Sequence, residues 1–238
     1  MIGFGILAFA VCGYMVARES ALFAIERIEV QGGSPRVAGQ VRQALASLAG
    51  RPLVGLDGSS VLGKVDALPT VVRSSYDRAF PHTLRITIVP ERPVAVVRRG
   101  SGAWLVSIRG RVMERLPSVA EPRLPRIWLS ARTPVDVGSG LAASGARLAA
   151  RAAGLAGRFG ARITTVTYTG EALVFHLRSG LQLLLGDGGS IRLKVAVAEH
   201  ALGTVPSGST FLDVSAPGRA VSGVGSLGFA TPQGSGGG

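Results

Sequence analysis

An apolar stretch without a charged residue opens the chain and constrains what the rest can fold into. It runs from Ile2 to Ala17 and is closed by Arg18 and Glu19. A membrane-spanning helix needs roughly 20 predominantly apolar residues and tolerates about 17, so this stretch lies at the short end of that range. A cleaved signal peptide would carry a basic residue before the apolar run, and this segment has none. A buried core helix is the other alternative, but a glycine-rich, charge-free stretch at the N-terminus does not fit it well. We therefore expect residues 1–22 to form a membrane anchor.

Composition gives the rest of the chain ample core material and a basic surface. Of the 238 residues, 47% are hydrophobic, which suits one large domain or two small ones. The 26 Lys and Arg against 14 Asp and Glu give a net charge of +12, so an anionic neighbour is expected. Because the arginines are scattered and aromatic residues are only 5%, we expect no nucleic-acid partner. The single cysteine, Cys12, allows neither an intramolecular disulfide nor a thiolate cluster.

Residues 23–92 show the periodicities of a small α+β domain. Ser34 followed by Pro35 predicts the start of a first helix, and Asp57 is expected to cap a second one. Alternation of apolar and polar residues predicts the strands, and three-and-four spacing predicts the helices. The predicted order is strand, helix, helix, strand, strand: Ile25–Gln31, Val37–Leu48, Val61–Leu68, Val71–Arg78 and Leu84–Val89.

From residue 93 to residue 224 the pattern changes to short strands, which predict a second domain. We expect it to be a mixed β domain of antiparallel strands flanked by helices. An alanine-rich helix is expected over Leu141–Phe159 and another over Ile191–Leu202, with Lys194 pointing outward. The tail at 225–238 is rich in glycine and is expected to be disordered. The predicted strands are Val94–Val97, Trp104–Ile108, Arg111–Glu114, Ile163–Tyr168, Ala172–Leu177, Leu181–Leu185, Thr210–Val214 and Arg219–Val224.

The patterns that carry enzyme chemistry are missing from the sequence. His82, His176 and His200 are far apart and form no metal-binding spacing. There is no GxSxG nucleophile elbow, and the glycine-rich segments lack the lysine of a phosphate-binding loop. Asp66 and Asp77 show no paired-carboxylate arrangement. We therefore expect no catalytic residue, no cofactor and no metal, and hence no enzyme.

Several sequence fragments, in one order, resemble a known family. FAIERIEVQGG, RPLVGLD, VDALPTVVRSSYDRAFPHTLRITIVPERPVAVV and WLVSIRGRVM resemble the POTRA domain and the following hairpins of FtsQ/DivIB cell division proteins. LGDGGSIRLKVAVAEHAL and STFLDVSAPGRAV resemble the later glycine-led helix and closing hairpin of that family. The likeness spans Phe23 to about Val224. Ser107 and Ser215 depart from it, since the family often has an acid and an arginine at these places.

The resemblance implies an α+β fold with a transmembrane helix at 1–22, a POTRA domain (β-α-α-β-β) at 23–92 and a β domain at 93–224. It also implies a single-pass type II protein of the cytoplasmic membrane, with its folded domains extracytoplasmic at the division septum. Its partners would be FtsB/DivIC-like and FtsL-like proteins and, through them, the septal synthase FtsW/FtsI. Its role would be that of a scaffold that links early and late division proteins and helps to control septal peptidoglycan synthesis.

The same resemblance places partner binding at the closing hairpin. An edge strand offers unpaired backbone groups to which a partner segment adds as a further strand. The expected partner-binding residues are Phe211, Val214, Arg219, Ala220, Val221 and Ser222. An ordinary terminal strand remains the alternative for this segment. For the whole chain, the alternatives are a POTRA-type transport or outer-membrane assembly component and a basic binder of cell-wall polymer or nucleic acid.

Overall fold

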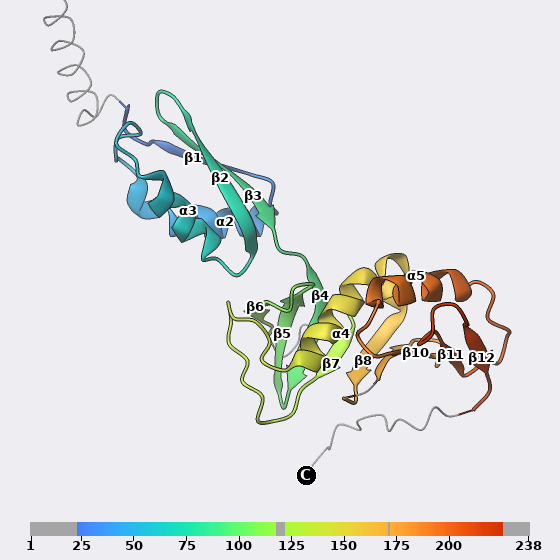
Figure 1. The fold of residues 1–238 in the computed structure, drawn as a ribbon. Coiled ribbons are helices and arrows are strands. Elements are labelled where there is room, and N and C mark those ends of the chain that lie inside the picture. Colours follow the sequence, from blue (N-terminus) through green and yellow to red (C-terminus); the bar gives the residue numbers. More distant parts are fainter. Residues whose placement is uncertain (1–22, 118–121, 171, 226–238) are drawn as a thin grey trace, which may run out of the picture. The chain divides into compact units, whose positions relative to one another are not determined.

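The computed structural model describes residues 23–117, 122–170 and 172–225 (Figure 1). The chain divides into two compact units, with the division between Glu91 and Arg92. Among the described residues, no helix is both long enough and apolar enough to cross a membrane. The anchor predicted for residues 1–22 and the tail from 226 onward lie outside the described residues.

The N-terminal unit is a three-stranded sheet with helices packed against it. Its elements are β1 (Arg27–Gln31), α2 (Pro35–Ala44), a 3₁₀ turn (Ala46–Leu48), α3 (Gly58–Asp66), β2 (Val71–Ala79) and β3 (Thr83–Pro90). The strand order is β1-β3-β2, with β1 parallel and β2 antiparallel to β3. The order of strands and helices is the one that the periodicities predict.

Local hydrogen bonds explain where the helices of this unit begin. The hydroxyl of Ser34 accepts a hydrogen bond from the Val37 amide at 3.4 Å, and Pro35 takes the first helical position. Asp57 Oδ1 accepts the Ser59 amide at 3.0 Å, which confirms the predicted cap of the second helix. The apolar stripes of both helices then face the sheet and form one core, with Val41, Leu45, Val61, Val65, Leu84 and Ile86 at its centre.

The C-terminal unit is built on a nine-stranded sheet whose order is β12-β11-β10-β9-β8-β7-β4-β5-β6. The first part of the unit consists of β4 (Pro93–Arg99), β5 (Gly102–Ser107), β6 (Val112–Arg115), β7 (Arg126–Trp128) and α4 (Ser144–Leu155). After a 3₁₀ segment (Gly157–Arg162) follow β8 (Ile163–Tyr168), β9 (Leu173–Leu177), β10 (Gln182–Gly186), α5 (Ile191–Ala201), β11 (Phe211–Asp213) and β12 (Val221–Gly223).

The sheet contains parallel as well as antiparallel neighbours, whereas the sequence predicted antiparallel strands. The pairs β8/β9, β9/β10 and β11/β12 are antiparallel, as predicted. However, β4/β7, β7/β8 and β10/β11 are parallel. Parallel neighbours need a crossover connection, and α4 between β7 and β8 and α5 between β10 and β11 supply two of them. The short strand β7 was not predicted from the sequence.

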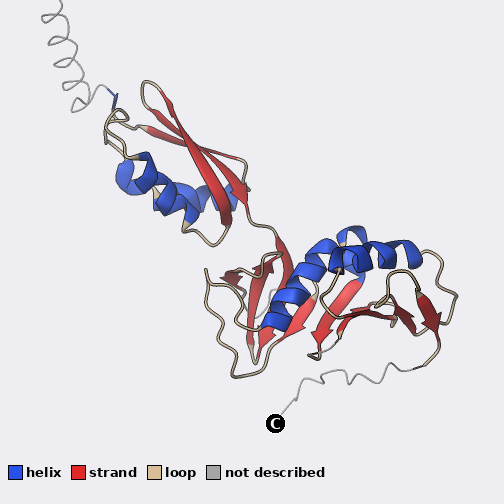
Figure 2. Cartoon of the chain, in the orientation of Figure 1, coloured by secondary structure: helices blue, strands red, loops and turns tan. Residues whose placement is uncertain are grey.

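Both helices of this unit lie side by side on one face of the sheet (Figures 1 and 2). Helix α4 contacts β4, β5, β7 and β8, whereas α5 contacts β10 and α4. The buried side of α4 consists of alanines, which lets the helix approach the strands closely: Ala146, Ala149, Ala150, Ala152 and Ala153. The larger core side chains come from the strands, with Phe175, Leu173 and Leu183 fully buried.

Candidate partner-binding edge

The strand β12 forms one end of the nine-stranded sheet. It pairs with β11 in the register Phe211 to Gly223, Leu212 to Ser222 and Asp213 to Val221. Within the part of the chain that the structure describes, no strand pairs with the outer side of β12. One edge of its backbone is therefore available to another polypeptide.

The opposite end of the sheet is covered by its own chain. The Val112 amide of β6 donates to the Ser139 carbonyl, and the Gly138 amide donates to the Val112 carbonyl, both at 2.8 Å. This loop occupies backbone groups that an incoming strand would need. The two ends of the sheet thus differ, and β12 is the more accessible one.

The structure places the predicted binding residues in different settings. Val221, on β12, is 45% exposed, and Ser222 is half-buried next to it. Arg219 and Ala220 are exposed but precede the strand, because the Arg219 amide donates to the Ala216 carbonyl at 2.9 Å and closes a turn. Val214 is fully buried and packs in the core, so its side chain supports the hairpin from within.

Phe211 covers a glycine on the neighbouring strand. Its ring lies against Gly223, where an added methyl group would be 3.0 Å from Phe211 Cζ. An aromatic side chain over a cross-strand glycine compensates for the missing side chain there. Phe211 is therefore suited to hold β12 in register.

Thr210, just before β11, holds the chain at the end of β12. Its amide donates to the Gly223 carbonyl at 2.9 Å. Its hydroxyl accepts the Gly225 amide at 2.8 Å and donates to the Gly225 carbonyl at 2.5 Å. The two hydrogen bonds to Gly225 fix the chain just beyond β12.

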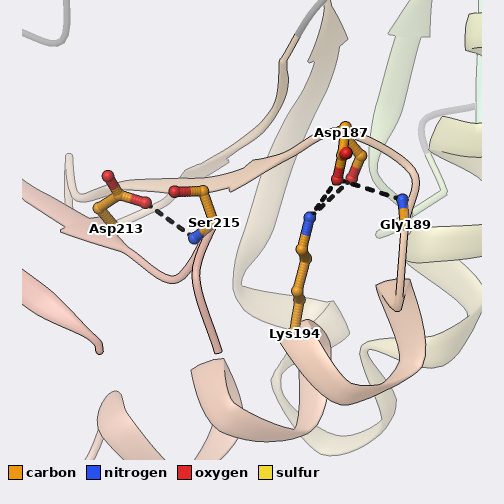
Figure 3. Close-up of polar contacts among 5 residues, drawn as sticks. All are labelled: Asp187, Gly189, Lys194, Asp213 and Ser215. Carbon is orange, nitrogen blue, oxygen red and sulfur yellow. Dashed lines mark hydrogen bonds and ion pairs between the residues drawn. The ribbon is translucent and has the colours of Figure 1, made fainter. Parts of the chain in front are cut away.

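Lys194 and Asp187 form an ion pair next to the hairpin. The sequence predicted that Lys194 points outward, and this prediction is wrong. Its side chain is buried, and its Nζ donates to the Asp187 carbonyl at 3.1 Å and to Asp187 Oδ1 at 2.5 Å (Figure 3). The hydrogen bond from Lys194 and its positive charge hold the pKa of Asp187 below its usual value. The pair fixes the loop between β10 and α5.

The same loop touches the chain that follows β11. A methyl group at Gly186 would lie 2.8 Å from Cβ of Ser215, and the φ of Gly186 is +64°. The Ser215 amide in turn donates to Asp213 Oδ1 at 2.8 Å (Figure 3). Lys194, Asp187 and Ser215 therefore support the hairpin from the side of α5. In the sequence, this cluster is indicated by Asp187, which lies seven residues before Lys194 and is followed by two glycines.

Two of the histidines and one of the acids singled out in the sequence form contacts with neighbouring residues. His82 Nδ1 lies 3.2 Å from the Ala24 carbonyl, and His176 Nε2 lies 3.1 Å from the Thr167 hydroxyl. Asp66 accepts a hydrogen bond from the Ser74 hydroxyl at 2.7 Å. In the described ranges, no three His, Cys, Asp or Glu side chains gather in a metal-binding arrangement.

The comparisons with known proteins point to one family. No protein-family model matches the chain. It is 26% identical over 224 residues to the cell division protein FtsQ of Streptomyces venezuelae, covering 91% of this chain and 80% of that protein. It is also 30% identical over 77 residues to the cell division protein FtsQ of Streptomyces coelicolor, covering 32% of this chain and 29% of that protein. These similarities confirm the resemblance carried by the sequence motifs: along most of its length the chain is similar to a cell division protein FtsQ.

Proposed function

We propose that this chain is a non-enzymatic membrane scaffold of the bacterial division machinery. It acts by protein–protein contacts at the septum, where it links early and late division proteins and helps to control septal peptidoglycan synthesis. The similarity to FtsQ along most of the chain supports the division role. The partners we propose are FtsB/DivIC-like and FtsL-like proteins and, through them, the septal synthase.

The proposed arrangement has three parts. Residues 1–22 form a single transmembrane helix, since they hold the charge-free apolar stretch. Residues 23–92 form a POTRA domain, which the strand-helix-helix-strand-strand order supports. Residues 93–224 form the β domain that binds the partner, and both domains are extracytoplasmic.

The observation that carries the proposal is the open outer side of β12. An extended partner segment can add to this strand and gain backbone hydrogen bonds without any catalytic group. Val221 presents an exposed side chain on the same strand, and Arg219 lies just before it. Specificity would come from these side chains, since backbone hydrogen bonds are the same for every sequence.

The test is co-purification of the detergent-solubilised full chain with the FtsB/DivIC-like and FtsL-like proteins of its host. Val221→Pro removes a backbone donor and places a ring on the edge strand, so it should abolish capture. Val221→Thr is the matched control, because it is also β-branched and keeps the backbone N–H. It should capture the partners as the wild type does.

Thermal unfolding of the three proteins separates binding from folding. Loss of capture by Val221→Pro alone, with an unfolding midpoint close to that of the wild type, supports strand addition at β12. Capture by both variants would move the interface away from this edge. A wild-type chain that captures neither partner would contradict the scaffold proposal itself and favour the transport or polymer-binding alternatives.

A further inference from the structure

A basic groove runs across the helical side of the C-terminal unit, away from the hairpin residues discussed above. It is a hollow of about 580 Å³, which adjoins a second one of about 510 Å³ at Arg151 and Arg192. We propose that this groove binds an acidic amphipathic helix of another protein. The groove is lined by Ile108, Arg109, Ser144, Arg147, Leu148, Arg151, Leu155 and Arg192.

The charge of the groove is of one sign. Four arginines line it, and among the described residues that line either hollow there is no carboxylate. Arg147 and Arg151 are one helical turn apart on α4, about 6 Å along the axis, which matches acids spaced four residues apart on a partner helix. Arginine binds carboxylates through two parallel hydrogen bonds, so these residues favour an acidic partner.

The walls of the groove are built by close contacts with glycines. A methyl group at Gly154 would lie 2.6 Å from Cγ1 of Ile108, so the Ile108 side chain lies directly on the backbone of α4. One at Gly188 would lie 3.0 Å from Cδ2 of Leu148, which rests against the loop before α5. Because the apolar walls are packed against backbone, the groove exists before a partner arrives, and less conformational entropy is lost on binding.

Hydrogen bonds orient one of the arginines. Arg147 Nη1 donates to the carbonyls of Leu141 and Ala142 at 2.6 and 2.8 Å. Its stem lies against Gly110, where a methyl group would be 3.1 Å from Arg147 Cγ. The guanidinium is therefore held in one orientation, whereas Arg151 and Arg192 are exposed.

The mixture of side chains selects the class of partner. Ile108, Leu148 and Leu155 lie between the arginines, and a phosphate polymer without apolar groups would leave them in contact with water. Helices and a closed turn line the groove, and no strand edge is present there for an extended segment to join. A helix with leucine-like residues on one stripe and acids beside it satisfies both the apolar and the basic walls.

The experiment uses the full chain in the membrane of its host's cells. Ser144→p-benzoylphenylalanine places a photoreactive group at the exposed rim of the groove, and the cross-linked peptide is sequenced by mass spectrometry. The expected product is a protein segment with acidic and apolar residues at helical spacing. A synthetic peptide of that segment is then titrated against the purified chain by fluorescence anisotropy.

Charge reversals test whether the arginines are responsible. Arg151→Glu with Arg192→Glu should weaken peptide binding by about tenfold or more, since two attractive contacts become repulsive. Arg123→Glu with Arg132→Glu changes the net charge equally on exposed residues of the same unit outside the groove, and it should leave binding within about twofold. An equal loss in both double variants would contradict the proposal, as would cross-links only to lipid or glycan, or none.

This inference and the proposed strand addition can fail separately. Val221→Pro should leave the Ser144 cross-link unchanged, because β12 does not line the groove. The Arg151 and Arg192 reversals should likewise leave capture of the FtsB/DivIC-like protein unchanged. If the cross-linked segment were the one that adds to β12, and Val221→Pro abolished the cross-link, the groove would not be an independent site.

Discussion

The ammonium group of Lys194 lies 2.5 Å from Asp187 Oδ1, although the Lys194 side chain is only 5% exposed and the Asp187 side chain is 78% exposed. A buried ammonium is costly unless it is paired and hydrogen-bonded. Asp187 supplies a carbonyl as well as a carboxylate, so two of the three ammonium protons have partners in one residue. The loop between β10 and α5 therefore depends on this pair, and through Gly186 and Ser215 the hairpin that follows depends on it too.

The two ends of this pair should respond differently to mutation. Asp187→Asn leaves the buried ammonium without its counter-charge and should lower the unfolding midpoint. Lys194→Met removes the buried charge and keeps a side chain of similar shape, so it should destabilise less than Asp187→Asn or even stabilise. The double variant should resemble Lys194→Met. Thermal unfolding of all four proteins gives a double-mutant cycle, and additive effects of the two changes would contradict the coupling.

The free energy of unfolding should decrease as the pH is lowered, in two separate pH ranges. Burial lowers the pKa of His176 below its usual 6.5, so the unfolded chain takes up this proton first and stability is lost as the pH falls below about 6.5. Lys194 lowers the pKa of Asp187 below its usual 3.8, so its contribution is complete above that value and is lost as the pH falls through the lowered pKa.

Single substitutions assign each window. His176→Gln should flatten the dependence of the unfolding midpoint on pH in the mildly acidic window and leave the more acidic one unchanged. Asp187→Asn should do the reverse. The measurement is the thermal unfolding midpoint of the detergent-solubilised chain across both windows, and a wild-type slope that survives in the matching variant would refute the assignment.

The fold was predictable from sequence wherever a local pattern decides it. Ser34 and Asp57 start their helices as expected because capping is a contact within one turn. Alternation likewise located most strands of both units. By contrast, β7 is only three residues long, too short to show a period, and its three-residue segment Arg126–Trp128 becomes a strand because β4 and β8 flank it.

The parallel pairings and the buried lysine escaped prediction for a related reason. Strand direction depends on which elements become neighbours after α4 and α5 cross over, and no local pattern encodes that. Lys194 lies on the core side of α5, where helical spacing would have placed an apolar residue, so its charge suggested the wrong face. The closing strand was predicted at Arg219–Val224, and the structure has it at Val221–Gly223. Val214 was assigned to the preceding strand, but it follows the last residue of β11 and is fully buried.

Two helical glycines offer opposite predictions. At Gly145 on α4, an added methyl group would overlap the Tyr168 ring, so Gly145→Ala should destabilise by about 1–3 kcal/mol. At Gly39 on α2 no heavy atom lies within 4 Å of the added methyl group, so Gly39→Ala should stabilise by about 0.4–1 kcal/mol through its effect on the unfolded chain. Denaturant unfolding followed for each unit would show the two signs. A Gly145→Ala variant as stable as the wild type would contradict the packing at Gly145, and a destabilised Gly39→Ala variant would contradict the open space at Gly39.

The last prediction concerns the edge strand itself. Phe211 lies over Gly223, its register partner, and removing the ring takes away a side-chain contact that holds β12 against β11. Phe211→Ala should therefore increase the rate of amide hydrogen exchange over Val221–Gly223 by about fivefold or more, because β12 opens locally more often. Ser222→Ala is the matched control on the same strand, and it should leave exchange nearly unchanged. Exchange should also stay unchanged in β8 and β9, which lie in the middle of the sheet. If Phe211→Ala left β12 as protected as in the wild type, the ring would not be what orders the strand to which the proposed partner adds.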